Sequence, residues 1–190
     1  LHLSIRRQRQ MCIRDRDLLS QLVRTTFTAE EGFELAVSDF SAIEARVIAW
    51  FAGEQWRLDV FNTHGKIYEA SAAQMFNVPV ESITKGDPLR QKGKVSELAL
   101  GYQGGPGALK AMGALEMGLG EEELKPLVES WRAANPNIVD FWKGCQNAAI
   151  QTVKTRTEHH THGLRFYIKK GFLMIELPSG RALAYPKAVS

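Results

Sequence analysis

The chain has 190 residues, of which 44% are hydrophobic, and it carries 24 basic and 21 acidic side chains. This length is enough for one domain with a sizeable core. The absence of a long apolar run and the presence of only two cysteines exclude a membrane-spanning protein and a disulfide-built secreted domain, and they favour a reducing cytoplasm.

The positive charge is concentrated at the N-terminus. Residues 1–16 carry five Arg and one Asp, a net charge of +4, so residues 17–190 together carry −1. The segment does not begin with Met and shows no periodicity, which is typical of a disordered or foreign tail; a basic DNA-binding arm is the alternative. We therefore exclude residues 1–16 from the predicted fold, and any argument for DNA binding depends on local cations.

The first candidate motif follows a short mixed or helical lead-in over residues 17–27. Leu35–Val37 is predicted to be a short buried strand, which Asp39 closes, and a helix is expected from Ser41 to about Ala52. A carboxylate held at a strand end suits Mg²⁺, which prefers oxygen ligands in tight octahedral geometry. The alternative is structural: Ser41 and Glu44 have the spacing of a capping box, and Asp39 would then be an ordinary turn residue.

The second candidate motif is a helix that starts at Asp87-Pro88, with Asp as N-cap and Pro in the first turn. Arg90, Lys94 and Leu98 recur every four residues and therefore share one face. Arg and Lys can hold a triphosphate, and Leu98 could pack against a sugar or base. The alternative is an ordinary solvated face, which is the expected fate of Lys92.

Glycines interrupt this second motif. Gly93 costs about 1 kcal/mol relative to Ala in a helix interior, which argues against a helix optimised for stability alone. Gly101, Gly104, Gly105 and Gly107 are expected to break the helix and to give a flexible end that a base pair or backbone can approach closely.

The remaining elements change in type along the chain, from helices to strands. Three histidines, His159, His160 and His162, lie between the two regions and are expected to form an exposed loop rather than a zinc site. The predicted helices span residues 56–61, 68–76, 109–117, 121–134 and 138–152. The predicted strands span residues 164–169, 172–177 and 181–185, in a meander with turns at Lys170-Gly171 and 178–180.

These motifs, in this order, resemble the family A DNA polymerases, the group of bacterial DNA polymerase I and phage replicative enzymes. The first motif resembles motif A of the family, and the second resembles motif B, the nucleotide-binding helix of the fingers. The segments that carry the resemblance are Leu22–Phe27, Asp39–Arg46, Lys66–Phe76, Arg90–Tyr102 and, for phage-type members, Leu177–Arg181.

The resemblance implies roles at the metal and the sugar. Asp39 would ligate both catalytic Mg²⁺ ions, with the backbone carbonyl of Phe40 assisting. Glu44 would be the steric gate that excludes a ribose 2′-hydroxyl, and Leu98 would pack against the sugar. The family usually has Phe or Tyr at that last position, so slower and more selective incorporation and poor use of dideoxynucleotides are expected.

The resemblance also implies contacts with triphosphate and DNA. Arg90 and Lys94 would bind the incoming triphosphate, with Lys94 a candidate proton donor to pyrophosphate. Tyr68 would stand where the family often has a phosphate-contacting His. The implied DNA contacts are Arg24, Tyr102 beside the templating position, and Arg181.

The implied fold is α+β, and the implied activity is template-directed DNA synthesis. Residues 17–55 would form part of a palm sheet with motif A, residues 56–152 helical fingers with motif B, and residues 153–190 a β-meander that returns to the palm. Deoxynucleotides would be added to a primer 3′ end on primer–template DNA with two Mg²⁺ ions, in the cytoplasm of a bacterium or phage-infected cell and away from any membrane.

One departure from the family leads us to expect a fragment that is inactive alone. The second metal-binding carboxylate of the family lies in a His-Asp-Glu motif, and that tripeptide does not occur here. The alternatives are a single-subunit RNA polymerase, against which Glu44 argues, a non-catalytic nucleotide- or nucleic-acid-binding module, and a helical interaction protein without a ligand.

Overall fold

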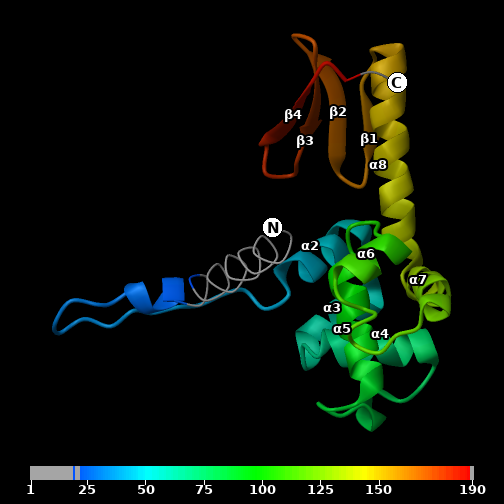
Figure 1. The fold of residues 1–190 in the computed structure, drawn as a ribbon. Coiled ribbons are helices and arrows are strands. Elements are labelled where there is room, and N and C mark those ends of the chain that lie inside the picture. The colour runs from blue at the N-terminus through cyan, green and yellow to red at the C-terminus, as the bar shows by residue number, and fades with distance from the viewer. Residues whose placement is uncertain (1–18, 20–21, 189–190) are drawn as a thin grey trace, which may run out of the picture. The chain divides into compact units, whose positions relative to one another are not determined.

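The computed structural model describes residue 19 and residues 22–188, and the chain divides into two compact units, residues 1–41 and residues 42–190 (Figure 1). In the described part of the first unit, a 3₁₀ helix, η1 (Val23–Thr26), precedes irregular chain. Of the lead-in predicted over residues 17–27, residues 17, 18, 20 and 21 lie outside the described residues, and η1 occupies Val23–Thr26.

The strand predicted at Leu35–Val37 is wrong. Residues 33–40 have no regular secondary structure, and the side chains of Leu35 and Val37 are 57% and 93% exposed. Within the described residues this segment joins no sheet, and an extended segment without a neighbouring strand satisfies its backbone groups with water instead. An apolar run alone therefore did not indicate burial.

The capping box predicted at Ser41 is also wrong. Helix α2 (Ile43–Ala52) begins two residues later, and its N-cap, Ala42, has a left-handed conformation with φ of 50° and no capping side chain. Glu44 consequently lies in the first turn, where its negative charge complements the helix dipole, rather than at the third helical position of a capping box.

The second unit begins with a helical part, whose elements are shown in Figure 1. After α2 these elements are α3 (Gln55–Thr63), α4 (Ile67–Phe76), η2 (Val80–Ser82), α5 (Pro88–Leu100), α6 (Pro106–Ala111), α7 (Glu121–Ala134) and α8 (Pro136–Thr155). The predicted start of α5 is confirmed, because the Asp87 side chain accepts a hydrogen bond of 2.7 Å from the Leu89 backbone N–H. The helix predicted over 109–117 is wrong, since Gly113 takes a φ of 79° and α6 ends before it.

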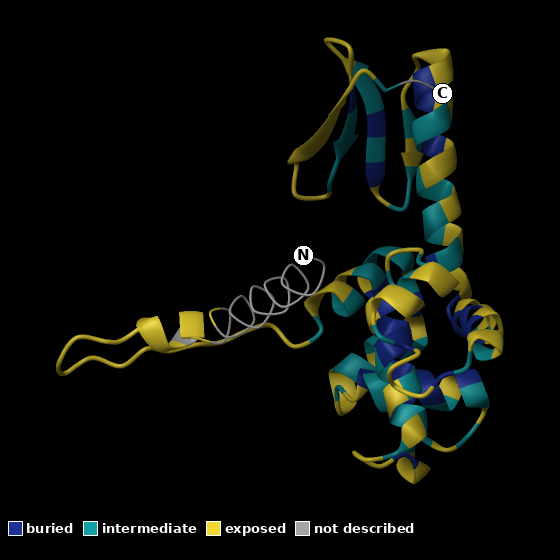
Figure 2. Cartoon of the chain, in the orientation of Figure 1, coloured by how far each residue is buried: buried dark blue, intermediate teal, exposed yellow. Residues whose placement is uncertain are grey.

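The helical core lies where α4, α5, α7 and the start of α8 meet, as the buried segments in Figure 2 show. Trp131 is fully buried at its centre and stacks on Trp142 with ring centroids 5.9 Å apart. Helices α4 and α5 approach closely at Gly93, where an added Cβ would lie 2.2 Å from the carbonyl oxygen of Tyr68. The buried position of Gly93 therefore permits close packing of the two helices.

The second unit ends in a four-stranded antiparallel meander, with strand order β1-β2-β3-β4. Three strands match the predicted ones to within a residue, whereas β1 occupies part of the predicted histidine loop. The strands are β1 (His159–Thr161), β2 (Leu164–Lys169), β3 (Phe172–Glu176) and β4 (Ala182–Pro186). Helix α8 covers one face of the sheet and buries Leu164 and Phe166 against Ala148, which confirms an α+β fold.

Two further observations concern only the described residues. No three or more His, Cys, Asp or Glu side chains in that part of the chain gather into an arrangement that could hold a metal ion, and the three histidines are no exception. No helix in the same part combines the length and apolar character needed to traverse a bilayer.

Candidate functional site

The candidate site is built on one face of α5. Arg90 and Lys94 are half-buried, and Leu98, one turn further along, is 45% exposed. Gly93 and Glu97, which flank this stripe on the same helix, are buried against neighbouring helices. The buried flank holds α5 in place, and the stripe beside it presents two cations and an apolar side chain.

Arg90 is oriented by two side chains of α4. Its Nε donates a hydrogen bond of 2.7 Å to Oε1 of Glu69, and its guanidinium lies 5.7 Å from the centre of the Tyr68 ring. Burial acts to raise the pKa of Glu69, but the hydrogen bond and positive charge of Arg90, with the charge of Lys66, outweigh it and lower the pKa. Glu69 is therefore ionised near neutral pH, and it partly neutralises Arg90.

Lys94 has no such partner. Within the described residues its ammonium group makes no ion pair and no hydrogen bond. Lys92, on the same helix, differs: its Nζ lies 2.7 Å from Oε1 of Glu123 on α7. The two lysines therefore have different surroundings, and Lys94 is the cation on α5 whose charge remains available to an anion.

Two other predicted residues, Glu44 and Tyr102, lie close to each other near this stripe. Both line a cavity of about 80 Å³, together with Arg57 and Glu97. Partial burial raises the pKa of Tyr102, and the neighbouring carboxylate of Glu44 raises it further. The phenol therefore remains protonated and can donate a hydrogen bond to that carboxylate. The rest of the Tyr102 side chain is 71% exposed.

An apolar hollow adjoins this pair. It measures about 350 Å³ and is lined by α2 and α8 side chains, among them Val47, Phe51 and Phe141, as well as by Glu44 and Tyr102. Together the stripe, the Glu44–Tyr102 pair and the hollow place cations, one carboxylate and apolar surface on neighbouring elements. In general, such cations can bind phosphate oxygens, and such apolar surface can pack against a sugar or a base.

Other predicted residues lie elsewhere. Asp39 and Phe40 are exposed and belong to the first unit. Arg24 lies in η1, and its side chain is outside those that the structure describes. Arg181 is exposed at the β3–β4 turn, in the sheet region. The structure thus groups Glu44 with Tyr102 and Tyr68 with Arg90.

The prediction missed a buried polar network beside the stripe. Oε1 of Glu97 accepts hydrogen bonds from Arg57 at 2.9 Å, Ser71 at 2.8 Å and Trp131 Nε1 at 2.9 Å, and Oε2 pairs with the same Arg57 guanidinium. Arg57 also donates to Asn135 at 2.9 Å. This network joins α3, α4, α5 and α7 next to the candidate site.

A sequence signal for this network did exist. Gly93, Ser96, Glu97 and Leu100 follow the i, i+3, i+4, i+7 spacing of one helix face, and all four are buried. A charged residue at the centre of such a face indicates a buried ion pair. The partner, Arg57, is 40 residues away, and no local pattern identifies it.

Comparison with known proteins shows which family this chain is similar to. A family model described as DNA polymerase family A matches residues 8–170. The chain is 69% identical over 171 residues to a DNA polymerase of Bacillus phage SP02, covering 90% of this chain and 26% of the phage protein. It is 29% identical over 130 residues to DNA polymerase I of Pseudomonas aeruginosa, and 31% identical over 120 residues to the thermostable DNA polymerase I of Thermus aquaticus.

Each match covers most of this chain but only a small part of the relative. These two bacterial matches cover 68% and 63% of this chain, but only 14% of either relative. The chain therefore spans about a quarter of the length of the phage relative, and a smaller part of the bacterial ones.

Proposed function

The chain belongs to DNA polymerase family A, and on that premise we propose that it binds the incoming deoxynucleoside triphosphate of a DNA-directed DNA polymerase. The α5 stripe receives the nucleotide: Arg90 and Lys94 hold the triphosphate and Leu98 packs against the sugar. In the reaction, a primer 3′-oxygen attacks the α-phosphate and pyrophosphate leaves, with the template supplied by DNA. In this proposal residues 17–55 belong to the palm, 56–152 to the fingers, and 153–190 to a meander beside the palm.

The observation that carries this proposal is the arrangement of the stripe. A cation without a partner in the described residues, Lys94, lies one turn from Arg90, whose planar guanidinium Glu69 and Tyr68 hold in place. Arg can grip phosphate oxygens with two parallel hydrogen bonds, and Lys adds a mobile point charge. Glu44, beside Tyr102, is the proposed gate against a ribose 2′-hydroxyl.

The metal requirement of the family is only partly met by the described residues. Asp39 offers one carboxylate, and Mg²⁺ is often held by one or two carboxylates together with substrate phosphates. In the described part of the chain, no three or more Asp, Glu, His or Cys side chains lie together in a way that could hold a metal ion. Asp39 therefore fits as one ligand of Mg²⁺, and a complete two-metal centre does not follow from these residues. The contribution we derive for this chain is nucleotide binding and orientation.

The test is nucleotide affinity in Lys94→Ala. Charge-assisted hydrogen bonds contribute about 1.5–3 kcal/mol each, so the variant should bind a fluorescent deoxynucleoside triphosphate about tenfold to a hundredfold more weakly, measured by fluorescence anisotropy with Mg²⁺ present. Lys92→Ala is the matched control, because it removes the same charge from the same helix but away from the stripe. Equal weakening in both variants, or none in Lys94→Ala, would contradict the proposal.

A second prediction concerns Glu69→Gln. The substitution removes the negative charge that neutralises Arg90 but keeps a side chain of the same shape, so Arg90 becomes a stronger phosphate ligand. Because partly exposed ion pairs are worth about 0.2–1 kcal/mol, nucleotide affinity should rise by up to about fivefold. The same anisotropy titration measures it, and a fall in affinity would show that Glu69 acts mainly by orienting Arg90.

A pH titration provides the complementary check. The depressed pKa of Glu69 means that the ion pair is intact above the ordinary pKa of a glutamate and is lost as the pH falls through its lowered value. The difference in nucleotide affinity between the wild type and Glu69→Gln should therefore shrink as the pH falls into that acidic range. A difference that does not depend on pH would contradict this explanation.

A further inference from the structure

Positive charge is unevenly distributed within the second unit. Residues 143–188, which comprise most of α8 and the four strands, carry eight basic and two acidic side chains, a net charge of +6. Residues 42–142 carry ten basic and thirteen acidic side chains, a net charge of −3. The stripe on α5 therefore lies in an acidic region, and the basic region is separate from it.

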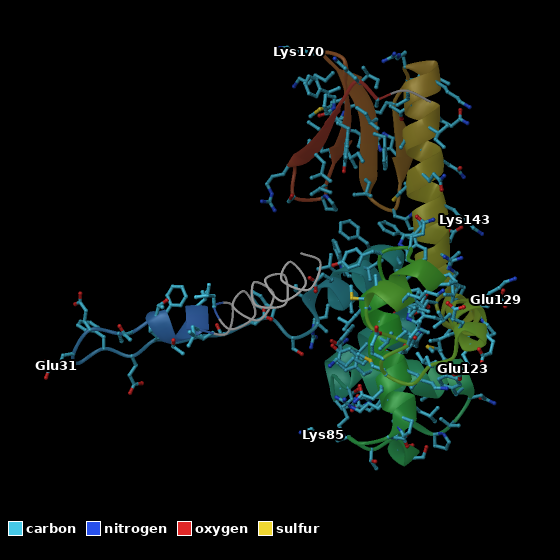
Figure 3. The ribbon with its side chains drawn as sticks, in the orientation of Figure 1. Glu31, Lys85, Glu123, Glu129, Lys143 and Lys170 are labelled. Atoms are coloured by element: carbon cyan, nitrogen blue, oxygen red, sulfur yellow. The ribbon has the colours of Figure 1, made fainter. Side chains whose placement is uncertain are left out.

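Much of this basic charge lies at one end of the sheet. Lys169 ends β2 and Lys170 forms the turn to β3, while Lys187 follows β4, whose last residue, Pro186, pairs with Phe172 beside the same turn. The C-terminal end of α8 lies at this end too (Figure 1), and Figure 3 labels Lys170 there. We call these five exposed residues the basic tip: Lys154, Arg156, Lys169, Lys170 and Lys187.

The acidic side chains of this region do not neutralise the basic tip. Glu158 pairs with Arg165 at 3.1 Å and with His160 at 2.7 Å, and Glu176 pairs with the same Arg165. Within the described part of the chain, none of the five basic-tip residues makes an ion pair. A cluster of like charges without internal partners costs free energy through repulsion, and an anionic partner would relieve it.

The shape and chemistry of the basic tip fit a polyanion with closely spaced charges. Lys169 and Lys187 are separated by two strand spacings, about 10 Å in total. Duplex DNA carries one phosphate per about 3.4 Å of axis on each strand, so several phosphates fall within this span. Phe172, paired with Lys169 and 40% exposed, adds apolar surface that can contact a sugar or base.

From this arrangement we propose that the basic tip binds the phosphodiester backbone of DNA, at a site distinct from the α5 stripe. The choice of DNA as the polyanion depends on the function proposed above. The contacts are electrostatic and independent of base sequence, and they hold the nucleic acid beside the sheet while the nucleotide binds at α5.

The experiment compares two charge-reversal variants of the full chain, K169E/K170E and K85E/K125E. Both change the net charge equally, but Lys85 and Lys125 are exposed lysines of the helical part. Binding of a short fluorescein-labelled DNA duplex is followed by anisotropy over a range of salt concentrations. K169E/K170E should bind at least about tenfold more weakly, with a salt slope smaller by about two, whereas K85E/K125E should stay within about twofold of wild type.

Several outcomes would overturn the inference. Equal weakening in both variants would indicate a general charge effect, and unchanged binding in K169E/K170E would exclude the basic tip. Vesicles containing anionic phospholipid form a second arm of the experiment. If K169E/K170E lost vesicle binding but kept DNA binding, the partner would be a membrane surface instead.

Nucleotide titration of the same proteins separates this inference from the proposed function. K169E/K170E should keep wild-type nucleotide affinity, because its substitutions lie in the sheet and not on α5. If wild type bound DNA through the basic tip but failed to bind nucleotide, the proposed function would fail and the basic tip would stand. If nucleotide bound normally and the two charge variants bound DNA alike, only the basic tip would fail.

Discussion

Glu97→Gln should destabilise the second unit by about 3–5 kcal/mol, because it leaves the buried guanidinium of Arg57 without a counter-charge. Arg57 is 1% exposed, and its Nε has no hydrogen-bond partner within the described residues. Its remaining partner, Asn135, is neutral and supplies no counter-charge. The loss is a large share of the total stability of an ordinary domain, which is about 5–15 kcal/mol.

The network makes this residue more sensitive than an ordinary glutamate. Glu97 accepts hydrogen bonds from three helices, and a glutamine can present only one of its two terminal atoms as an acceptor. The amide NH₂ would face an Arg57 N–H in either orientation, and in one of them also the N–H of Trp131. Every orientation of the amide therefore places donor against donor in a buried site.

Urea denaturation followed by tryptophan fluorescence measures the effect, as a lower midpoint with an unchanged slope. Glu129→Gln is the matched control, because Glu129 is exposed on α7 and lies 3.9 Å from Lys125. That control should change the free energy of unfolding by less than about 0.5 kcal/mol. Equal midpoints for the two variants would show that the Arg57–Glu97 pair contributes no net stability.

Gly93→Ala should also destabilise the protein, by about 2–3 kcal/mol, although alanine is the better helix former by about 1 kcal/mol. The new Cβ would lie 2.2 Å from the carbonyl oxygen of Tyr68 and 3.1 Å from Cβ of Ala72. Both neighbours are part of α4, whose backbone cannot move aside alone, so α4 and α5 would have to separate. The separation would also shift Arg90 relative to Tyr68 and Glu69.

Gly107→Ala is the control for this second prediction. Gly107 lies in α6, and an added Cβ would meet nothing within 4 Å. There the helix propensity of alanine acts without a clash, so the free energy of unfolding should stay the same or rise by up to about 1 kcal/mol. Thermal unfolding of the two variants should therefore shift in opposite directions, and a stabilised Gly93→Ala would refute the close-packing explanation.

The helix and strand boundaries that were predicted well depend on neighbouring residues. Asp87 and Pro88 start α5, and three consecutive acids begin α7, as expected from capping and the helix dipole. The turns at Lys170-Gly171 and Pro178–Gly180 likewise separated the strands of the meander. These signals act over at most four residues, so the sequence alone reveals them.

The predictions that failed depend on distant residues. Leu35–Val37 is apolar enough for a strand, but within the described residues no neighbouring strand pairs with it. The histidine segment became β1 because β2 pairs with it, which its own composition does not indicate. In both cases, hydrogen bonding between segments decided the outcome, and local propensity did not.

For the candidate site, the sequence by itself determined the order of the motifs and the stripe of Arg90, Lys94 and Leu98, because helical periodicity follows from spacing alone. Only the tertiary structure decided that Glu69 holds Arg90, that Lys92 is paired while Lys94 is not, and that Glu97 is buried against Arg57. These differences arise from contacts between helices that are distant in sequence. Burial and charge pairing depend on which helices pack together, and one sequence read along its length does not specify that.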